Sequence, residues 1–484
     1  MVNKEERTEN ALLVLLALLG VGLILYFFFL VGPQWDVTAH YLSGRALLSP
    51  EFYSASFSHI MDQNAGIYFE QFRSPFSEFL FAGVYLVLQN QDLTYIIYEL
   101  LLFALFFLAV RFFARKTGRS RAERLVLYAV LLTPYFILFP LVINSTEIIS
   151  ASMLIFALAY MSENDGRAGL FLGLASLSKY ISLAFLPLVF LLRPKKQMAI
   201  GLLLEAAAIL PWLAFNQALF GNPLLSYEYA FGDVISSAMP TSIPLVPFLF
   251  AVGAPAIFAI LAFAARGGET SVVQRARRAL ASLTQERRVL LAFLIIAAFA
   301  FAYVARYHEF TDQARWGYAL AVAVSIPAAA YFFTARRRIE AWTRRHARPL
   351  GRLNVQTLAL ILSIAIMLLG YLYVFVGYQL NPNFLRYNVL YQSSVFAQAK
   401  AEVQALGYSN CLIVSNAWIS LLYENMTVYS PYSAQNDSYP ILMFRITGVD
   451  PSLIKGLGSA NVLYSNQDFE VLATRNATCI APAS

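Results

Sequence analysis

Long apolar stretches recur along almost the whole chain, and clusters of Lys and Arg separate them. A helix needs about 20 apolar residues to cross the hydrocarbon core of a bilayer. Only helices or closed barrels satisfy every backbone N–H and C=O group in lipid, and these runs have helical length without the alternation of barrel strands. With 59% hydrophobic and only 13% charged residues, the chain is predicted to be an α-helical polytopic membrane protein.

The lengths of the apolar runs predict about eleven membrane-spanning helices, and three of these are short for a bilayer. The first run has no small-residue cleavage site before Gly32 and Pro33, so we expect it to stay attached as a signal anchor. The expected spans are residues 11–31, 93–113, 125–143, 147–161, 168–178, 181–192, 198–217, 243–265, 289–306, 316–334 and 355–378.

The positive charges test this topology, because short loops rich in Lys and Arg stay on the cytoplasmic side of a membrane. With the N-terminus inside, every basic loop falls on that side if two conditions hold. Residues 76–88 must form a juxtamembrane or re-entrant helix that does not cross, and residues 169–192 must be two short helices that turn near Lys179. One long helix that carries Lys179 at mid-membrane is the alternative.

The net charge of +7 does not indicate nucleic acid binding, because the Lys and Arg residues lie in loops between the spans. The partner that the composition requires is the lipid bilayer. Basic loops, together with glycosylation sequons at Asn144, Asn425, Asn436 and Asn476, suit the plasma membrane of a prokaryote, and we expect an archaeal one. A bacterial plasma membrane and the endoplasmic reticulum stay open as alternatives.

The sequence changes character near residue 380, and we expect a membrane module over residues 1–379 followed by a small extracytoplasmic α/β domain over residues 380–484. Both cysteines, Cys411 and Cys479, fall in this last segment, where a disulfide and two buried free thiols are both open. Helices are expected over residues 393–406 and 417–424, and strands over 411–415, 462–464 and 469–472.

Ionisable side chains at a membrane boundary are energetically unfavourable unless they form ion pairs, face water or have a functional role. In this chain they concentrate on the predicted outer side. Asp36 and His40 follow the first span, in a long outer loop over residues 32–92. In a helix they would share a face, and such a pair suits deprotonation of a hydroxyl or binding of a divalent cation. A solvated helix start that Asp36 caps is the alternative.

Further charged residues lie at the other predicted outer turns. Glu70 and Arg73 come shortly before residues 76–88, where a local ion pair is the simplest interpretation. Glu147 and Lys179 occupy two separate turns. Arg and Lys at a membrane-level cavity suit a phosphate group, and a carboxylate beside them suits general-base work on a hydroxyl.

The loop after the ninth predicted span is also rich in charge, with Arg306, His308, Glu309 and Arg315. These residues would add cations and a second carboxylate to the same membrane face. Snorkelling of long side chains at helix ends would also place Arg306 and Arg315 there.

Short motifs follow one another over roughly residues 11–320, and their shared order is informative. They are Trp35-Asp36, His40-Tyr41 and Gly44-Arg45-Ala46-Leu47, then Arg73-Ser74-Pro75, residues 144–147, residues 173–180, residues 215–223, and His308-Glu309 with Arg315-Trp316. In this order they resemble the GT-C superfamily of membrane glycosyltransferases, in particular its branch with protein O-mannosyltransferases and bacterial aminoarabinose transferases. Residues 173–180 match the GLA-x-L-T/S-K signature of that family.

Two departures from the family pattern limit what the resemblance implies. The family often has a double acid where this chain has Asp36-Val37. The chain also has no Trp-Trp-Asp segment like that of an oligosaccharyltransferase, which argues against transfer of a whole glycan.

The resemblance implies a GT-C-like fold and transfer of one sugar from a polyprenyl (dolichyl-type) phosphate carrier to a hydroxyl on a lipid, glycan or protein at the extracytoplasmic face. Asp36 is then the expected general base, with inversion at the anomeric carbon, and Glu147 positions the acceptor or a metal. The substrate-binding residues that it implies are His40, Arg45, Glu70, Arg73, Lys179, Tyr180, Asn216, Arg306, His308, Glu309 and Arg315.

Among these residues, Lys179, Arg306 and Arg315 are expected to stabilise the leaving phosphate. A divalent metal ion held by Asp36 and His40 is left open. The competing class is a multi-pass transporter or lipid flippase, which would place its charges near the membrane midplane and often show internal repeats. A receptor-like scaffold is a third class, but it does not account for Lys179 or Glu147.

Overall fold

The computed structural model describes residues 4–31, 35–54, 62–64, 67–69, 73–117 and 146–236. Shorter described pieces lie between residues 124 and 132, between 288 and 299, and between 365 and 474. Side chains at residues 4–8 and 35–37 are outside this description, as are those of β1 and most of β2.

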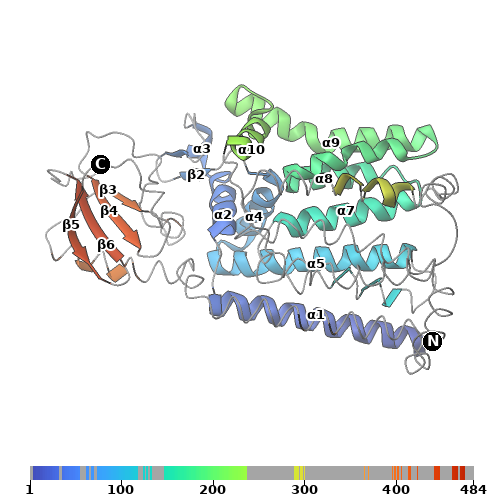
Figure 1. Ribbon diagram of the computed structural model, residues 1–484, viewed down its shortest axis with the longest axis horizontal. Helices are drawn as coiled ribbons and strands as arrows, with labels where there is room; N and C mark the ends of the chain where they lie inside the picture. Colours follow the sequence, from blue (N-terminus) through green and yellow to red (C-terminus); the bar gives the residue numbers. More distant parts are fainter. Residues whose placement is uncertain are drawn as a thin grey trace, which may run out of the picture.

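Five of the described helices lie side by side in Figure 1, and each packs on the next in chain order. They are α1 (Lys4–Val31), α5 (Gln91–Thr117), α7 (Thr146–Ser162), α8 (Ala168–Ser178) and α9 (Lys195–Phe220). Helices α1, α5 and α9 are long and apolar enough to cross a membrane. Helix formation over the predicted spans 11–31, 93–113, 147–161 and 198–217 is thus confirmed.

Short elements gather at one end of these helices, which we call the α2 end, while the N-terminus lies at the opposite end (Figure 1). They are α2 (Trp35–Ala46), α3 (Pro50–Ser54), α4 (Pro75–Leu88), α10 (Leu225–Ser236) and the antiparallel pair β1 (Asp62–Asn64) and β2 (Ile67–Phe69). The predicted long loop after the first span therefore contains its own helices and a strand pair.

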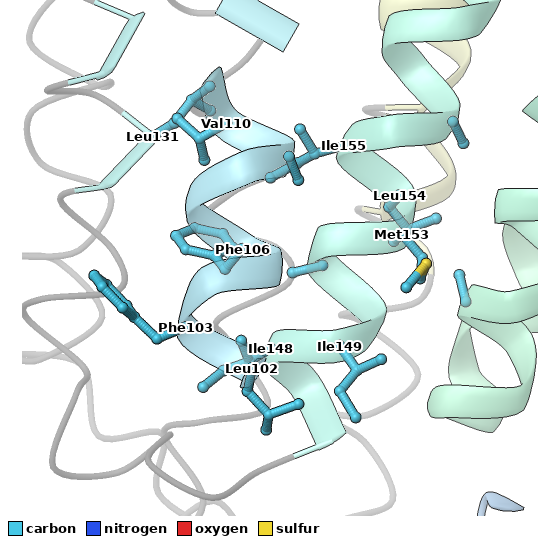
Figure 2. Packing of buried hydrophobic residues seen from close by; sticks show 14 of the residues in the cluster. Leu102, Phe103, Phe106, Val110, Leu131, Ile148, Ile149, Met153, Leu154 and Ile155 are labelled. Atoms are coloured by element: carbon cyan, nitrogen blue, oxygen red, sulfur yellow. The ribbon is translucent and has the colours of Figure 1, made fainter. Parts of the chain in front are cut away.

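Helices α5 and α7 form the centre of the described core. Figure 2 shows Leu102 of α5 beside Ile148 of α7, and Val110 of α5 beside Leu131. All of these side chains are almost fully buried. Close packing of apolar side chains holds membrane helices together through van der Waals contact, because lipid removes the hydrophobic driving force between them.

The helical conformation is interrupted at Lys179, between α8 and the next helix. The backbone of Lys179 is extended, with φ of −156° and ψ of 119°. The 3₁₀ helix η1 (Tyr180–Leu191) then runs back along α8. The Arg193 backbone N–H donates to Asn164 Oδ1 at 3.1 Å, so both ends of this hairpin meet at the end opposite Lys179. The prediction of two short helices that turn near Lys179 is confirmed, and one continuous helix is excluded.

Glycines allow α8 to approach α9 closely. A Cβ atom at Gly169 would overlap the carbonyl group of Gly201, and one at Gly173 would lie 2.7 Å from the Cβ of Ala208. Both contacts are tighter than van der Waals distance. Small residues that let two backbones approach are a common device in membrane helix packing.

We therefore predict that Gly169→Leu destabilises the folded chain by about 2 kcal/mol or more, because the α8 hairpin must move away from α9. Thermal unfolding of the purified protein in detergent measures the effect. Gly22→Ala on α1 is the matched control, since a Cβ atom there meets nothing within 4 Å. Equal stability of the two variants would contradict this packing.

Helix α4 covers the predicted juxtamembrane segment 76–88. Its 14 residues extend about 21 Å, which is too short to cross a bilayer. Gly44 of α2 packs directly on it, because a Cβ atom there would lie 2.7 Å from the Glu78 carbonyl oxygen. The Ser77 hydroxyl bonds with that of Tyr98 and joins α4 to α5.

The C-terminal segment contains a four-stranded mixed sheet with the order β3-β4-β6-β5. Strands β3 and β4 are parallel, and the other neighbours are antiparallel. The expected strands near 411–415, 462–464 and 469–472 are present, whereas β4 was not predicted. The strands are β3 (Leu412–Ser415), β4 (Ile441–Ile446), β5 (Ala460–Ser465) and β6 (Phe469–Thr474).

Several predictions about this segment stay predictions. The helices expected over residues 393–406 and 417–424 lie mostly outside the described residues, as do Cys411 and Cys479. The boundary at residue 379 is untested for the same reason, and so are most of the later spans.

Candidate active site

Glu147 and Lys179 form an ion pair at the α2 end of the helices. The Lys179 Nζ atom donates to Glu147 Oε1 at 2.8 Å, and the Glu147 side chain is only 4% exposed. Glu147 lies in the first turn of α7, where the helix dipole favours a carboxylate. Two charges held away from water need each other, since either one alone would be strongly unfavourable.

The segment before α4 docks on the break at Lys179. The Ser74 hydroxyl donates to the Ser178 carbonyl at 2.6 Å, and the Tyr180 hydroxyl donates to the Arg73 carbonyl at 2.9 Å. These two bonds join positions more than 100 residues apart in sequence. Arg73 and Lys179 thus belong to two segments in direct contact.

This site lies near one end of the membrane-spanning helices. Tyr98 of α5 is within electrostatic reach of Glu147. Lys116 follows Tyr98 by 18 residues in the same helix, which corresponds to about 27 Å. A hydrocarbon core is about 30 Å thick, so the ion pair lies near one membrane boundary if Lys116 lies at the other.

His40 faces Glu78, a residue that the sequence patterns did not single out. The His40 Nδ1 atom lies 3.8 Å from Glu78 Oε1, and the Glu78 side chain is fully buried. Burial raises the pKa of Glu78 well above its ordinary value, while Arg73 and the Ser43 hydroxyl act in the opposite direction. A single carboxylate inside the apolar run of α4 was the signal available in the sequence.

We predict that Glu78→Gln stabilises the folded chain at neutral pH by about 1 kcal/mol, because the amide keeps the shape and removes a buried acid whose ionisation favours the unfolded chain. A raised folded-state pKa means that stability is full below the ordinary pKa of 4.5 and falls as pH rises through the folded value. The advantage of the variant over the wild type should therefore grow with pH.

Thermal unfolding of both proteins between pH 4.5 and 8.5 measures this dependence. Glu51→Gln, at an exposed position of α3, is the control and should show no such trend. A variant that is less stable than the wild type at pH 8.5 would mean that His40 and Arg73 hold Glu78 in its charged form.

Arg45 is held by aromatic rings at the α2 end. Its guanidinium carbon lies 5.8 Å from the Tyr41 ring centroid and 5.5 Å from that of Tyr85. The Tyr41 hydroxyl in turn donates to Gln91 Oε1 at 3.5 Å. Cation–π contacts of this kind orient an arginine side chain between α2 and α4.

Asn216 lies inside α9, fully buried, within the predicted span 198–217. Helix α9 ends later, at Gly221 with a positive φ of 70°. The Ser226 hydroxyl of α10 donates to Asn216 Oδ1 at 3.0 Å. The ring centroid of Tyr227, the residue after Ser226 in α10, lies 4.6 Å from that of Tyr180.

Several predicted site residues lie outside the described part of the chain, and their roles stay predictions. Asp36 belongs to α2, one helical turn before His40, but its side chain is not described. The same holds for the whole of Glu70, Arg306, His308, Glu309 and Arg315.

The metal site expected at Asp36 and His40 is also untested. Among the described residues, no three His, Cys, Asp or Glu side chains lie together as metal ligands would. The described chain supplies His40 and Glu78 at this place, and the side chain of Asp36 lies outside it.

The fold of this chain is similar to that of a solved structure. The chain matches the crystal structure of ArnT from Cupriavidus metallidurans in the apo state, with a TM-score of 0.55 and 14% sequence identity. The match covers 96% of this chain and 97% of that chain. No family model and no curated protein sequence matches the chain. The chain therefore has a fold similar to that of ArnT over almost its whole length.

Proposed function

We propose that this protein is a glycosyltransferase that moves one sugar from a polyprenyl-phosphate carrier to a hydroxyl acceptor at the extracytoplasmic membrane face. The observation that carries the proposal is the Glu147–Lys179 ion pair on a fold shared with ArnT, a GT-C aminoarabinose transferase. Arg73 adjoins the same break, so two cations accompany a carboxylate at one end of the helices.

The chemical step follows from these groups. The acceptor oxygen attacks the anomeric carbon while a carboxylate takes the hydroxyl proton, and the bond from that carbon to the phosphate oxygen breaks. The configuration inverts, and polyprenyl phosphate leaves with the electron pair. Asp36 is the proposed base. Lys179 stabilises the leaving phosphate, with Arg306 and Arg315 as further proposed cations.

The observed ion pair adds a detail to this scheme. In the absence of substrate, Lys179 is neutralised by Glu147. A carrier phosphate that reaches Lys179 replaces the carboxylate as its partner. Glu147 then becomes available to accept a hydrogen bond from the incoming hydroxyl, which is consistent with its proposed role in positioning the acceptor.

The charge pattern supports the proposed orientation. Lys116, in the last turn of α5, pairs with Glu163 at 2.7 Å, and Arg124 pairs with Glu9, near the start of α1, at 2.6 Å. The N-terminal end of α1 lies opposite the α2 end (Figure 1). Basic residues favour the cytoplasmic side. The α2 end and the C-terminal strands are then extracytoplasmic, in the plasma membrane of a prokaryote.

Transfer activity tests the proposal directly. Purified protein is incubated with radiolabelled polyprenyl-phosphate sugars and with lipid, glycan and peptide acceptors, and the products are separated from the carrier. We expect label to pass to one acceptor class and polyprenyl phosphate to be released. Movement of intact labelled lipid between leaflets of a proteoliposome, with no product, would support a flippase instead.

A further inference from the structure

A second group of side chains lies beside the ion pair, on the other side of Tyr180. It consists of Trp212 and Asn216 of α9 together with Ser226 and Tyr227 of α10. Ser226 and Trp212 both approach the Tyr180 side chain, whose hydroxyl donates to the Arg73 carbonyl. Tyr180 therefore contacts both this group and the segment that carries Arg73.

Three hydrogen-bond donors in this group are buried without an acceptor among the described residues. They are Trp212 Nε1, Asn216 Nδ2 and the Tyr227 hydroxyl. Trp212 is 3% exposed and Asn216 is 0% exposed. Leaving one such group unpaired is unfavourable, and native proteins rarely leave several of them together. Because the three residues are neighbours, we infer that a bound molecule supplies the acceptors.

The orientation of Asn216 follows from its neighbour. The Ser226 hydroxyl donates a hydrogen bond to the amide oxygen of Asn216 at 3.0 Å. The amide nitrogen of Asn216 is therefore the atom that can bind a ligand. Burial raises the pKa of Tyr227 to about 12, which keeps its hydroxyl protonated at physiological pH. All three atoms can thus donate a hydrogen bond, and a ligand with oxygen acceptors matches them.

Aromatic rings surround the donors. The rings of Trp212 and Phe215 stack at 5.1 Å, Phe79 meets Trp212 edge-on at 6.1 Å, and Tyr180 meets Tyr227 at 4.6 Å. A sugar combines hydroxyl oxygens around its edge with apolar C–H faces. It therefore fits a site that offers aromatic faces and a few fixed donors.

We propose that Trp212, Asn216 and Tyr227 form a saccharide subsite that binds the sugar of the carrier, while Lys179 and Arg73 bind its phosphate. The inference rests on the proposed transferase function and assigns a part of that site. Tyr180 contacts both parts, because its hydroxyl donates to the Arg73 carbonyl and its ring lies 4.6 Å from that of Tyr227.

A pair of conservative substitutions tests the subsite. Trp212→Phe with Tyr227→Phe removes two donors and keeps an aromatic ring at both positions, a phenyl in place of the indole at residue 212. Binding of undecaprenyl phosphate is compared with binding of the same carrier bearing glucose, mannose, galactose or 4-amino-4-deoxyarabinose, using the full chain in detergent. We expect at least one sugar to strengthen wild-type binding, and the double variant to lose about tenfold or more of that affinity.

The bare carrier separates the possible outcomes. Its affinity should be unchanged in the double variant, whereas Lys179→Met should weaken both lipids. Tyr229→Phe, also on α10, is the matched control and should leave both affinities unchanged. If no sugar strengthens binding to a wild type that binds the bare carrier, the donors hold only water and the subsite is wrong.

Two further results are decisive. An equal loss of affinity for the bare and the sugar-bearing carrier in the double variant would overturn the subsite. The substitutions would then act on phosphate binding or on the fold. A folded wild type that binds none of these lipids would remove the proposed function itself, and the subsite with it.

Discussion

Replacing Lys179 with Met is expected to lower sugar transfer by about 100-fold or more and to destabilise the folded chain by about 3 kcal/mol. The first loss arises because the variant has no cation at this position when negative charge develops on the leaving phosphate. The second arises because Glu147, which is only 4% exposed, is left without its partner. Product formation and thermal unfolding in detergent measure the two losses separately.

The double variant Lys179→Met with Glu147→Gln separates the two causes. It contains no buried unpaired charge at this pair, so its stability should return to within about 1 kcal/mol of the wild type. Its transfer activity should stay low, because the cation is still absent. Recovery of transfer together with stability would show that the ion pair serves the fold alone and would remove Lys179 from the proposed phosphate site.

The break at Lys179 could be predicted from the sequence for a physical reason. An unbroken helix over residues 169–192 would have placed Arg193 and Lys195 on the wrong side of the membrane, and the positive charges therefore required a turn. The partner of Lys179 could not be predicted in the same way. Glu147 is 32 residues away, and only the packing of α7 against α8 brings the two side chains together.

Glu78 was missed because it lies in an apolar run that was interpreted only as a juxtamembrane helix. Its burial depends on the close approach of α2 at Gly44, a long-range contact that local patterns do not reveal. The end of α9 was predicted three residues too early, at residue 217 rather than at Phe220. Gly221 with Pro223 marks the end of α9.

The C-terminal strands could also be predicted only in part from the local sequence. Three of the four strands follow from short apolar runs, but β4 (Ile441–Ile446) was not selected although it is equally apolar. It pairs in parallel with β3 and antiparallel with β6, so its role depends on neighbours on both sides. A run of this length does not show by itself whether it forms a strand.

Asp36→Asn is expected to fold like the wild type and to lose transfer by about 10²–10⁴-fold. Asparagine keeps the shape of the side chain but cannot accept the proton of an acceptor hydroxyl. The anchors of α2 lie elsewhere on the helix, at Gly44 against the Glu78 backbone and at His40 beside the Glu78 carboxyl. The substitution should therefore leave the position of α2 unchanged.

Three measurements are needed for this variant, namely product formation, carrier binding and thermal unfolding. Carrier affinity should be retained, since the cations that hold the phosphate are intact. Asp92→Asn, at an exposed acidic position in the first turn of α5, is the matched control and should keep full transfer. Asp36 lies one helical turn from His40 in α2. If the Asp36→Asn protein keeps normal transfer, Asp36 is not the general base. The proposed base is then Glu147, the carboxylate that a phosphate releases from Lys179.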